Sequence, residues 1–273
     1  MADLSIDQRP EGWCKAAESY DSSFGSFTAL FAQDAVRLAN VGPGHRVLDV
    51  GTGTGAFALI AEQAGAEVLA VDFSQGMIDC LNTKIDQKGL SRIHAVKMDG
   101  QALDIENNSY DSVFSVFGLC FFPDRIAGFR ELYRVLKPGG LGVVVNWCAL
   151  EHSQFLRVIV GALVKAIPNL PAPSAPPPGL SLADPNVLKS EMSQGGFSGI
   201  NLFTVRHLWT FPDPQVVYDS LASVQPMIAR IFEMAGDASR QAFRSAIIQM
   251  IRDEQGNGPY GLEGEARIAV GTK

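Results

Sequence analysis

The strongest chemical signal in this chain is the segment VLDVGTGTG at residues 47–55, in which three glycines alternate with two threonines after Asp49. Val-Leu-x-Val predicts a short buried strand, and the apolar residues of the next segment, 56–66, recur at helical spacing. The glycines therefore lie in a turn from strand to helix, where a missing Cβ lets a bulky ligand reach the backbone. Unpaired amide groups at the start of the helix face the same ligand. This pattern predicts a loop that binds a nucleotide or nucleoside cofactor.

Three carboxylates near this loop help to distinguish between NAD and S-adenosylmethionine as the cofactor. Asp72 ends the next predicted strand, where it can bind both ribose hydroxyls of an adenosine in NAD or in S-adenosylmethionine. Asp49 lies in a buried strand end, where it opposes a pyrophosphate but suits the cationic amine and sulfonium of S-adenosylmethionine. Asp99 follows the third predicted strand and can accept from the exocyclic amine of adenine. S-adenosylmethionine is therefore favoured, and NAD stays the alternative because Gly51-x-Gly53-x-x-Ala56 also fits the dinucleotide fingerprint.

Alternating strand and helix patterns position these residues between about 45 and 147. Strands are predicted at 46–50, 67–72, 93–98, 111–116 and 141–147, and helices at 55–65, 74–88 and 124–136. Apolar strands that alternate with helices indicate a parallel sheet covered on both faces. With two later strands, near 200–211 and 266–273, we expect an α/β fold: a Rossmann-like, seven-stranded, mostly parallel sheet with helices on both faces.

The pattern changes after residue 148. We expect an N-terminal part at 1–148 that binds the cofactor, a proline-rich insertion or lid at 149–185, and a C-terminal part of the core at 186–273. Amphipathic helices within 214–253 predict a partly helical substrate cap. Their apolar faces fit a homodimer contact equally well.

Composition and charge exclude several classes of function. The 273 residues are 47% apolar and 19% charged, as in an ordinary globular protein, and the net charge of −7 disfavours nucleic acid as a partner. No apolar run approaches the roughly 18 residues of a membrane span, and residues 1–13 lack the apolar core of a signal peptide. The four cysteines are scattered and do not cluster with histidines, so we expect a cytoplasmic protein without disulfides or a metal.

Four motifs in order carry a resemblance to a known family: LDVGTGTG, VDFSQGM, KMDGQAL and ELYRVLKPGG. The chain resembles the class I S-adenosylmethionine-dependent methyltransferases, most of all the small-molecule branch that includes the ubiquinone- and menaquinone-biosynthesis enzymes. The resemblance covers roughly residues 13–147 and, more weakly, the tail. It implies a methyltransferase that acts on a small molecule.

The resemblance also implies a role for each cofactor-binding residue. Gly51, Thr52 and Gly53 would bring backbone against the methionine part, and Asp72 would hold the ribose hydroxyls. The adenine would lie between Phe73 and Met77, and its edge would face Asp99, Gly100 and Gln101. Phe117 would present backbone to the methionine amine, and Tyr20 of the element WCKAAESYD would close over the methionine carboxylate. Trp13 of that element suits helix packing and cofactor contact equally well.

The catalytic residues stay open at this stage. Many members of the family carry histidines after the fourth strand, where this chain has Cys120-Phe121-Phe122. His152 and His207 are the remaining candidates for a general base, and Cys120 suits a small core thiol. Aromatic residues in the cap regions fit either an apolar acceptor pocket or the cap's own core; they are Phe121, Phe122, Trp147, Phe155, Trp209, Phe211, Tyr218 and Phe232. We therefore expect a methyltransferase for a small apolar or aromatic molecule, with an NAD-dependent oxidoreductase or a catalytically silent binding protein as alternatives.

Overall fold

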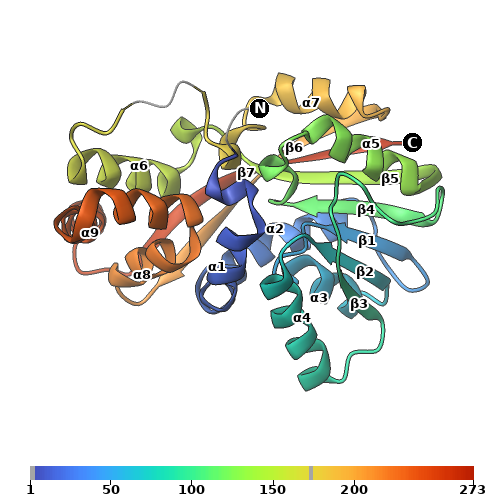
Figure 1. The fold of residues 1–273 in the computed structure, drawn as a ribbon, viewed down its shortest axis with the longest axis horizontal. Helices are drawn as coiled ribbons and strands as arrows, with labels where there is room; N and C mark the ends of the chain where they lie inside the picture. Colours follow the sequence, from blue (N-terminus) through green and yellow to red (C-terminus); the bar gives the residue numbers. More distant parts are fainter. Residues whose placement is uncertain (1–3, 172–174) are drawn as a thin grey trace.

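A single twisted sheet forms the centre of the molecule (Figure 1). The computed structural model describes residues 4–171 and 175–273. The seven strands lie in the order β3-β2-β1-β4-β5-β7-β6, and β7 runs antiparallel to both of its neighbours. Their bounds are β1 Arg46–Val50, β2 Glu67–Asp72, β3 Ile93–Lys97, β4 Tyr110–Val116, β5 Leu136–Trp147, β6 Ser198–Phe211 and β7 Tyr260–Thr272. The predicted seven-stranded, mostly parallel Rossmann-like sheet is confirmed.

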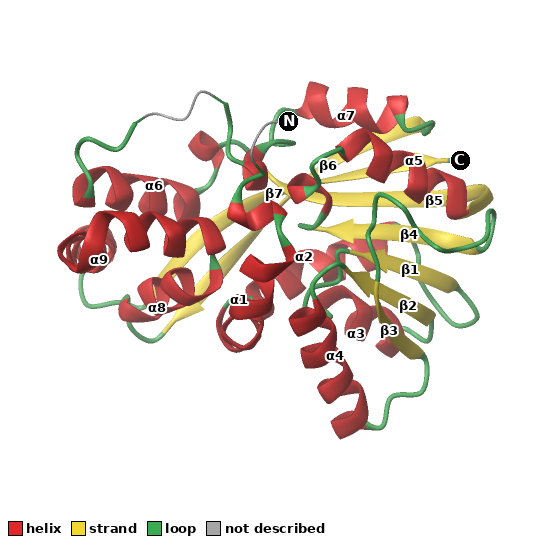
Figure 2. Ribbon diagram, viewed as in Figure 1, coloured by secondary structure: helices red, strands yellow, loops and turns green. Residues whose placement is uncertain are grey.

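Helices cover both faces of the sheet, as predicted (Figure 2). One face packs against α2 (Gly25–Leu38) and α3 (Ala56–Gln63), through fully buried residues such as Phe31 and Phe57. The other face packs against α5 (Arg125–Val135) and α7 (Pro185–Gln194), through Phe129 among others. Helix α4 (Gln75–Lys88) lies beside β2 and β3 and begins at Ser74, whose Oγ accepts from the Met77 amide.

A second group of helices builds the cap on an arm of the sheet. Beyond the pair Trp147–Ala266, β7 continues with β6 alone as far as Tyr260. Helices α6 (Gln154–Ala166), α8 (Gln215–Val224) and α9 (Pro226–Gln255) pack around this arm, at the left of Figure 1. Helix α9 is interrupted at Gly236, which has a non-helical backbone. The helices expected within 214–253 are thus present as α8 and the kinked α9.

Two local predictions need correction or fall outside the structure. Strand β5 begins at Leu136 rather than at residue 141, because the turn sequence KPGG is itself part of an extended segment and Gly139 donates to Lys273. The proline-rich insertion or lid predicted at 149–185 includes residues 172–174, which lie outside the described residues. Its described residues contain the short 3-10 helices η3 (Leu150–His152) and η4 (Pro178–Leu180) and helix α6.

The turn into α3 depends on one glycine. Gly55 precedes the helix with φ +88°, and a Cβ there would lie 2.3 Å from Leu81 Cδ1. Gly55→Ala should therefore lower the free energy of unfolding by about 2–3 kcal/mol, from backbone strain and overpacking together. Gly89→Ala is the matched control, because Gly89 has φ +61° with open space around it and should show the strain alone. Equal destabilisation in urea unfolding of both variants would contradict the overpacking.

Candidate functional site

A cavity of about 600 Å³ opens at the carboxyl ends of β1, β2 and β4, beneath helix α1 (Pro10–Ser23). All twelve residues predicted to bind the cofactor line it: Tyr20, Asp49, Gly51, Thr52, Gly53, Asp72, Phe73, Met77, Asp99, Gly100, Gln101 and Phe117. Parallel strands bring these residues together because their carboxyl ends meet at one edge of the sheet. The placement makes one binding site from four separate motifs, and the role of each residue stays a prediction.

The glycine loop forms a cradle at the bottom of the cavity. The amides of Gly51 and Thr52 donate to Val71 O at 2.9 and 3.0 Å, which fixes the loop to the end of β2. A Cβ on Gly51 would lie 3.1 Å from the Gly118 Cα, so the backbone after β4 packs directly on the loop. A Cβ on Gly53 would meet nothing within 4 Å. The loop is therefore close-packed beneath and open toward the cavity at Gly53.

Asp49 is a buried carboxylate with one unpaired oxygen. Its side chain is 1% exposed, and its Oδ2 accepts from Thr52 Oγ1 at 2.6 Å. Its Oδ1 has no hydrogen-bond partner although it is buried. Burial, assisted by the negative charge of Asp72, raises the pKa of Asp49 to about 7. A buried acceptor of this kind suits a cationic ligand group, which would supply the missing partner and favour the ionised form.

Asp72 is held rigidly at the end of β2. Its Oδ2 accepts from the Gly53 amide and its Oδ1 from the Ser74 amide, both at 2.9 Å. Burial raises its pKa to about 6, against the lowering effect of these two bonds. The carboxylate thus connects the glycine loop to the start of α4, and each oxygen keeps a second lone pair for a ligand hydroxyl.

The strand β3 end of the cavity has both apolar and polar walls. Asp99 Oδ1 accepts from the Gln101 amide at 2.9 Å, and Gln101 Oε1 accepts from the Asp124 amide at 2.8 Å. A Cβ on Gly100 would lie 2.4 Å from Phe122 Cζ, so only glycine fits there. Close packing and a chain of polar contacts thus hold this wall in one shape.

Phe117 has an unusual backbone for a bulky residue. Its φ is +56°, in the left-handed region, and its amide donates to Val145 O at 2.9 Å. Its ring stacks on Trp147 with centroids 4.2 Å apart. Such backbone strain persists only where surrounding contacts hold it, and here the stack does so. The turn directs the chain after β4 across the cavity toward Gly118 and the glycine loop.

Helix α1 closes the cavity from above. Trp13 packs edge-on against Phe121, with ring centroids 5.0 Å apart, and its Nε1 donates to Asp7 O at 2.7 Å. Trp13 packs α1 and also lines the cavity, and its contact with a cofactor stays a prediction. Asp21 near the end of α1 accepts from Thr54 Oγ1 at 2.9 Å and contacts Lys84 of α4. The helix is therefore fixed at both ends.

We expect these contacts to slow the release of a bound cofactor. Lys84 Nζ donates to Thr54 O at 2.7 Å as well as to Asp21, so it joins α1, α4 and the glycine loop. Lys84→Met should raise the dissociation rate of S-adenosylhomocysteine about fivefold, because a partly exposed ion pair contributes about 1 kcal/mol. Stopped-flow fluorescence measures this rate, and Lys88→Met, an exposed change on the same helix, is the control. An unchanged rate would show that α1 does not restrain the ligand.

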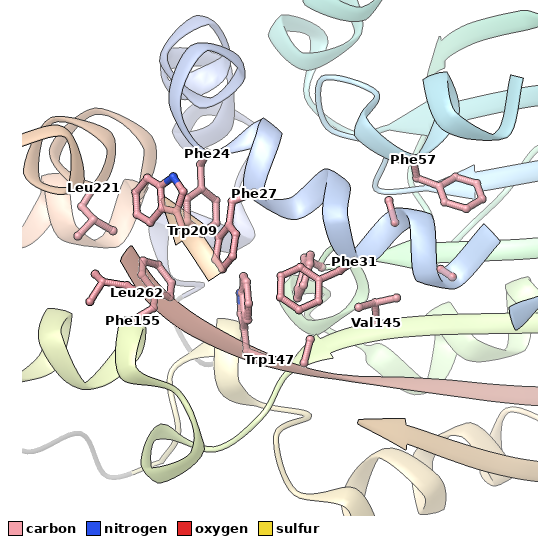
Figure 3. Packing of buried hydrophobic residues seen from close by; sticks show 14 of the residues in the cluster. Phe24, Phe27, Phe31, Phe57, Val145, Trp147, Phe155, Trp209, Leu221 and Leu262 are labelled. Atoms are coloured by element: carbon pink, nitrogen blue, oxygen red, sulfur yellow. The ribbon is translucent and has the colours of Figure 1, made fainter. Parts of the chain in front are cut away.

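The structure separates the predicted aromatic residues into two groups. Phe121, Phe122 and Trp147 line the cavity. The other five belong to the core of the cap or pack against it: Phe155, Trp209, Phe211, Tyr218 and Phe232. Figure 3 shows Phe155 and Trp209 packed in this cluster beside Leu221 and Leu262. For these five the structure favours the cap's own core, the alternative that the sequence left open, since neither helical nor strand spacing distinguishes a cap core from a cavity wall.

The candidate bases do not reach the cavity. His207 Nε2 lies 2.7 Å from Asp34 Oδ2 on the arm side of α2, and His152 lies exposed in η3. Neither is among the lining residues. Cys120 is 1% exposed, and burial raises the pKa of its thiol to about 12, so it suits a core thiol, as predicted.

Several residues that no sequence motif singled out also line the cavity, among them Leu4, Gln8, Lys97 and Gln225. Gln8 belongs to η1 (Ile6–Gln8), and Gln225 lies between α8 and α9. Leu4 and Gln8 come from the segment before α1, Gln225 comes from the cap, and Lys97 ends β3. The packing of η1 against α1 and α9 brings the first three to the same opening.

Comparisons with known proteins agree with this geometry. The family model described as "Methyltransferase domain" matches residues 48–144. A demethylmenaquinone methyltransferase of Renibacterium salmoninarum is 32% identical over 179 residues, which cover 62% of this chain and 73% of that protein. An uncharacterized protein of Mycobacterium tuberculosis is 37% identical over 125 residues, and the match spans only about half of either chain, 45% of each. The YcgJ protein of Bacillus subtilis has a similar fold, with a TM-score of 0.59 and 19% identity over 89% of this chain and 98% of that one.

The sheet order and the glycine loop with its carboxylates define a Rossmann-like protein that binds a nucleoside cofactor. Together with the similarity to the demethylmenaquinone methyltransferase, they show that the chain belongs to the class I S-adenosylmethionine-dependent methyltransferases. The cofactor of this family is S-adenosylmethionine, which decides against the NAD alternative. The residues present fit S-adenosylmethionine. The buried Asp49 Oδ1 has no partner and can accept from its ammonium, and Gly53 leaves open space above the loop. Within the described ranges no helix is long and apolar enough to cross a membrane.

Proposed function

We propose that this protein transfers a methyl group from S-adenosylmethionine to a small apolar or aromatic molecule. One observation carries the proposal: a single cavity contains the glycine loop with Asp49 and Asp72 and also the aromatic side chains Phe24, Phe121 and Trp147. Such a cavity can place a cofactor and an apolar molecule in direct contact, and about 600 Å³ lies within the usual range for small-molecule sites.

The contribution of the protein to this reaction is mainly alignment and exclusion of water. When bound, S-adenosylmethionine supplies a methyl carbon that is activated by its sulfonium and leaves behind a neutral thioether. Asp49 would neutralise the ammonium of the methionine part, and Asp72 would accept from the ribose hydroxyls. Trp13 and Tyr20 of α1 cover the site and exclude water. Alignment of this kind contributes up to roughly 7–11 kcal/mol in favourable intramolecular reactions.

Calorimetry tests the cofactor part of the proposal. S-adenosylmethionine and S-adenosylhomocysteine should bind with micromolar affinity, and NAD should show no binding. A radiolabelled methyl donor then tests transfer to a panel of apolar and hydrophilic acceptors. Label on hydrophilic acceptors alone would contradict the apolar pocket, whereas cofactor binding without any transfer would favour the catalytically silent alternative. Light scattering tests whether the cap helices form the contact of a homodimer.

A further inference from the structure

The cavity opens where strands β1 and β4 separate. The register pairs between these strands end at Asp49–Phe114, whereas β4 stays paired with β5 for two more residues. The strand order of the sheet reverses at the same place, with β2 and β3 beyond β1 and with β5 beyond β4 (Figure 1). Ser115 is the first residue of β4 after the last β1 pair, and it is not among the residues that line the cavity. Its position is therefore close to the site, because ligands bind at such switch points, but outside direct contact.

Ser115 forms a buried hydrogen bond inside the turn that follows β4. Its side chain is 0% exposed, and its Oγ accepts from the Leu119 amide at 2.9 Å. The bond closes the turn around Gly118, which lines the cavity. A Cβ on Gly118 would lie 3.1 Å from Ser115 Oγ and 3.1 Å from the Gly51 Cα, so these three groups meet at one point. The hydroxyl thus holds the turn at the place where the turn packs on the glycine loop.

The turn has support on both sides of Gly118. Before it, Phe117 has the left-handed φ of +56°, and its amide donates to Val145 O at 2.9 Å. After it, the Leu119 amide donates to Ser115 Oγ. A bulky residue keeps a left-handed backbone only where surrounding contacts hold it. Loss of the Ser115 hydroxyl would leave the buried Leu119 amide without this partner, which is costly enough to shift the turn.

From this geometry we propose that Ser115 is a positioning residue for the cofactor and acts through the backbone of the turn. The role rests on the proposed function, with the methionine part of S-adenosylmethionine between the glycine loop and Phe117. The Ser115 hydroxyl fixes the separation of these two walls, because Gly118 packs between it and Gly51. The backbone of the turn, and not the serine side chain, is what faces the ligand.

The effect of Ser115 should be confined to the methionine part of the cofactor. The sheet order places β4 two strands from β2 and three strands from β3. At ordinary strand spacing these separations are about 10 and 14 Å. The carboxylates proposed for the adenosine part, Asp72 at the end of β2 and Asp99 just after β3, are held by hydrogen bonds that do not involve the turn. A change at Ser115 should therefore leave the binding of adenosine groups as it is.

Calorimetry with a whole and a truncated ligand tests the proposal. Ser115→Ala should bind S-adenosylhomocysteine about tenfold more weakly than the wild-type protein, the size expected when one buried hydrogen bond is lost. Methylthioadenosine, which lacks the amino-acid part, should bind both proteins with equal affinity. Equal losses for the two ligands, or no loss for either, would overturn the proposal, because a serine with a merely structural role would affect the whole site or none of it.

Ser112→Ala is the matched control. Ser112 lies on the same strand and is only 3% exposed, but it pairs in register with Val47 and Leu141, away from the turn. Its replacement should leave both affinities unchanged. If Ser112→Ala reproduced the selective loss for S-adenosylhomocysteine, the effect would belong to β4 as a whole and the role assigned to Ser115 would be wrong.

Amide resonances of the wild-type protein give a second readout, which holds even if Ser115→Ala fails to fold. S-adenosylhomocysteine should shift the Gly118 and Leu119 amide signals, and methylthioadenosine should leave them unchanged. The Leu119 amide should also exchange slowly with deuterium, since it is buried and hydrogen-bonded. Equal shifts with both ligands, or rapid exchange at Leu119, would contradict the proposal.

The outcomes for Ser115 and for the proposed function are distinguishable. If Ser115→Ala shows the selective loss but no acceptor is labelled, methyl transfer fails as the function while the positioning role stands. If acceptors are labelled and Ser115→Ala binds both ligands as tightly as the wild-type protein, the protein is a methyltransferase and Ser115 does not position its cofactor.

Discussion

Asp49→Asn should bind S-adenosylmethionine about 100-fold more weakly than the wild-type protein and yet unfold at a higher temperature when no ligand is present. The carboxylate is buried, and only one of its oxygens has a partner, Thr52 Oγ1. The asparagine keeps that bond but has no charge to pair with the methionine ammonium. Removal of one partner from a buried ion pair costs about 3–5 kcal/mol, which is a factor of 100 or more in affinity.

The gain in stability depends on pH in a defined direction. The pKa of Asp49 is about 7 in the fold, against an ordinary value of 3.8. Between these values the folded protein holds a proton that the unfolded chain has lost, so the free energy of unfolding falls as the pH rises from about 4 to about 7. Above pH 7 the burial penalty of the charge is complete, and the asparagine removes it. The variant should therefore be the more stable protein at pH 8, and this gain should be lost below about pH 4.

Differential scanning calorimetry without ligand, at pH 4 and at pH 8, measures this effect. At pH 8 the unfolding temperature of Asp49→Asn should rise by about 2 °C or more, since each kcal/mol shifts it by about 2–4 °C in a chain of this size class. Asp104→Asn removes an exposed carboxylate from the segment between β3 and β4 and is the control. A lower unfolding temperature at pH 8 would show that Asp49 is stabilised by a partner other than Thr52.

The cofactor end of the site was predictable because its residues are local in the sequence. Asp49 and the glycines lie within one strand-to-helix turn, and Asp72 and Asp99 each end a strand with a clear apolar pattern. Parallel strands place such ends at one edge of the sheet regardless of how the chain continues. The order of the motifs was therefore enough to bring twelve lining residues together.

The cavity residues outside the cofactor motifs were not predictable in the same way. Phe155 of α6 and Trp209 of β6 have the same aromatic character as Phe121 and Trp147, but they pack in the core of the cap. Gln8 and Gln225 lie far apart in the sequence and line the same cavity because η1 packs on α9. The periodicity of the sequence does not carry this information. Whether an aromatic side chain faces the cavity or the core depends on packing between segments that are distant in the sequence.

Asp72→Asn should weaken the binding of S-adenosylmethionine about 100-fold and, unlike Asp49→Asn, should also destabilise the protein. Both oxygens of Asp72 accept from backbone amides, those of Gly53 and Ser74. An asparagine offers one oxygen, and its amino group must then face an N–H donor. That leaves one buried amide unsatisfied, at a cost of about 1–3 kcal/mol, in addition to the lost charge-assisted bonds to the ribose.

A truncated cofactor distinguishes the roles of the two carboxylates. Methylthioadenosine has the ribose and adenine of the cofactor but no amino-acid part, so its affinity should fall in Asp72→Asn and stay unchanged in Asp49→Asn. Asp86→Asn, on the exposed side of α4, is the control for a change of net charge. If both variants lost affinity for the fragment equally, both carboxylates would act by holding the conformation of the glycine loop. They would then not bind separate groups of the ligand. If only Asp72→Asn lost affinity for methylthioadenosine, Asp72 would be assigned to the ribose and Asp49 to the methionine part. This follows because S-adenosylmethionine and methylthioadenosine differ only in the amino-acid part.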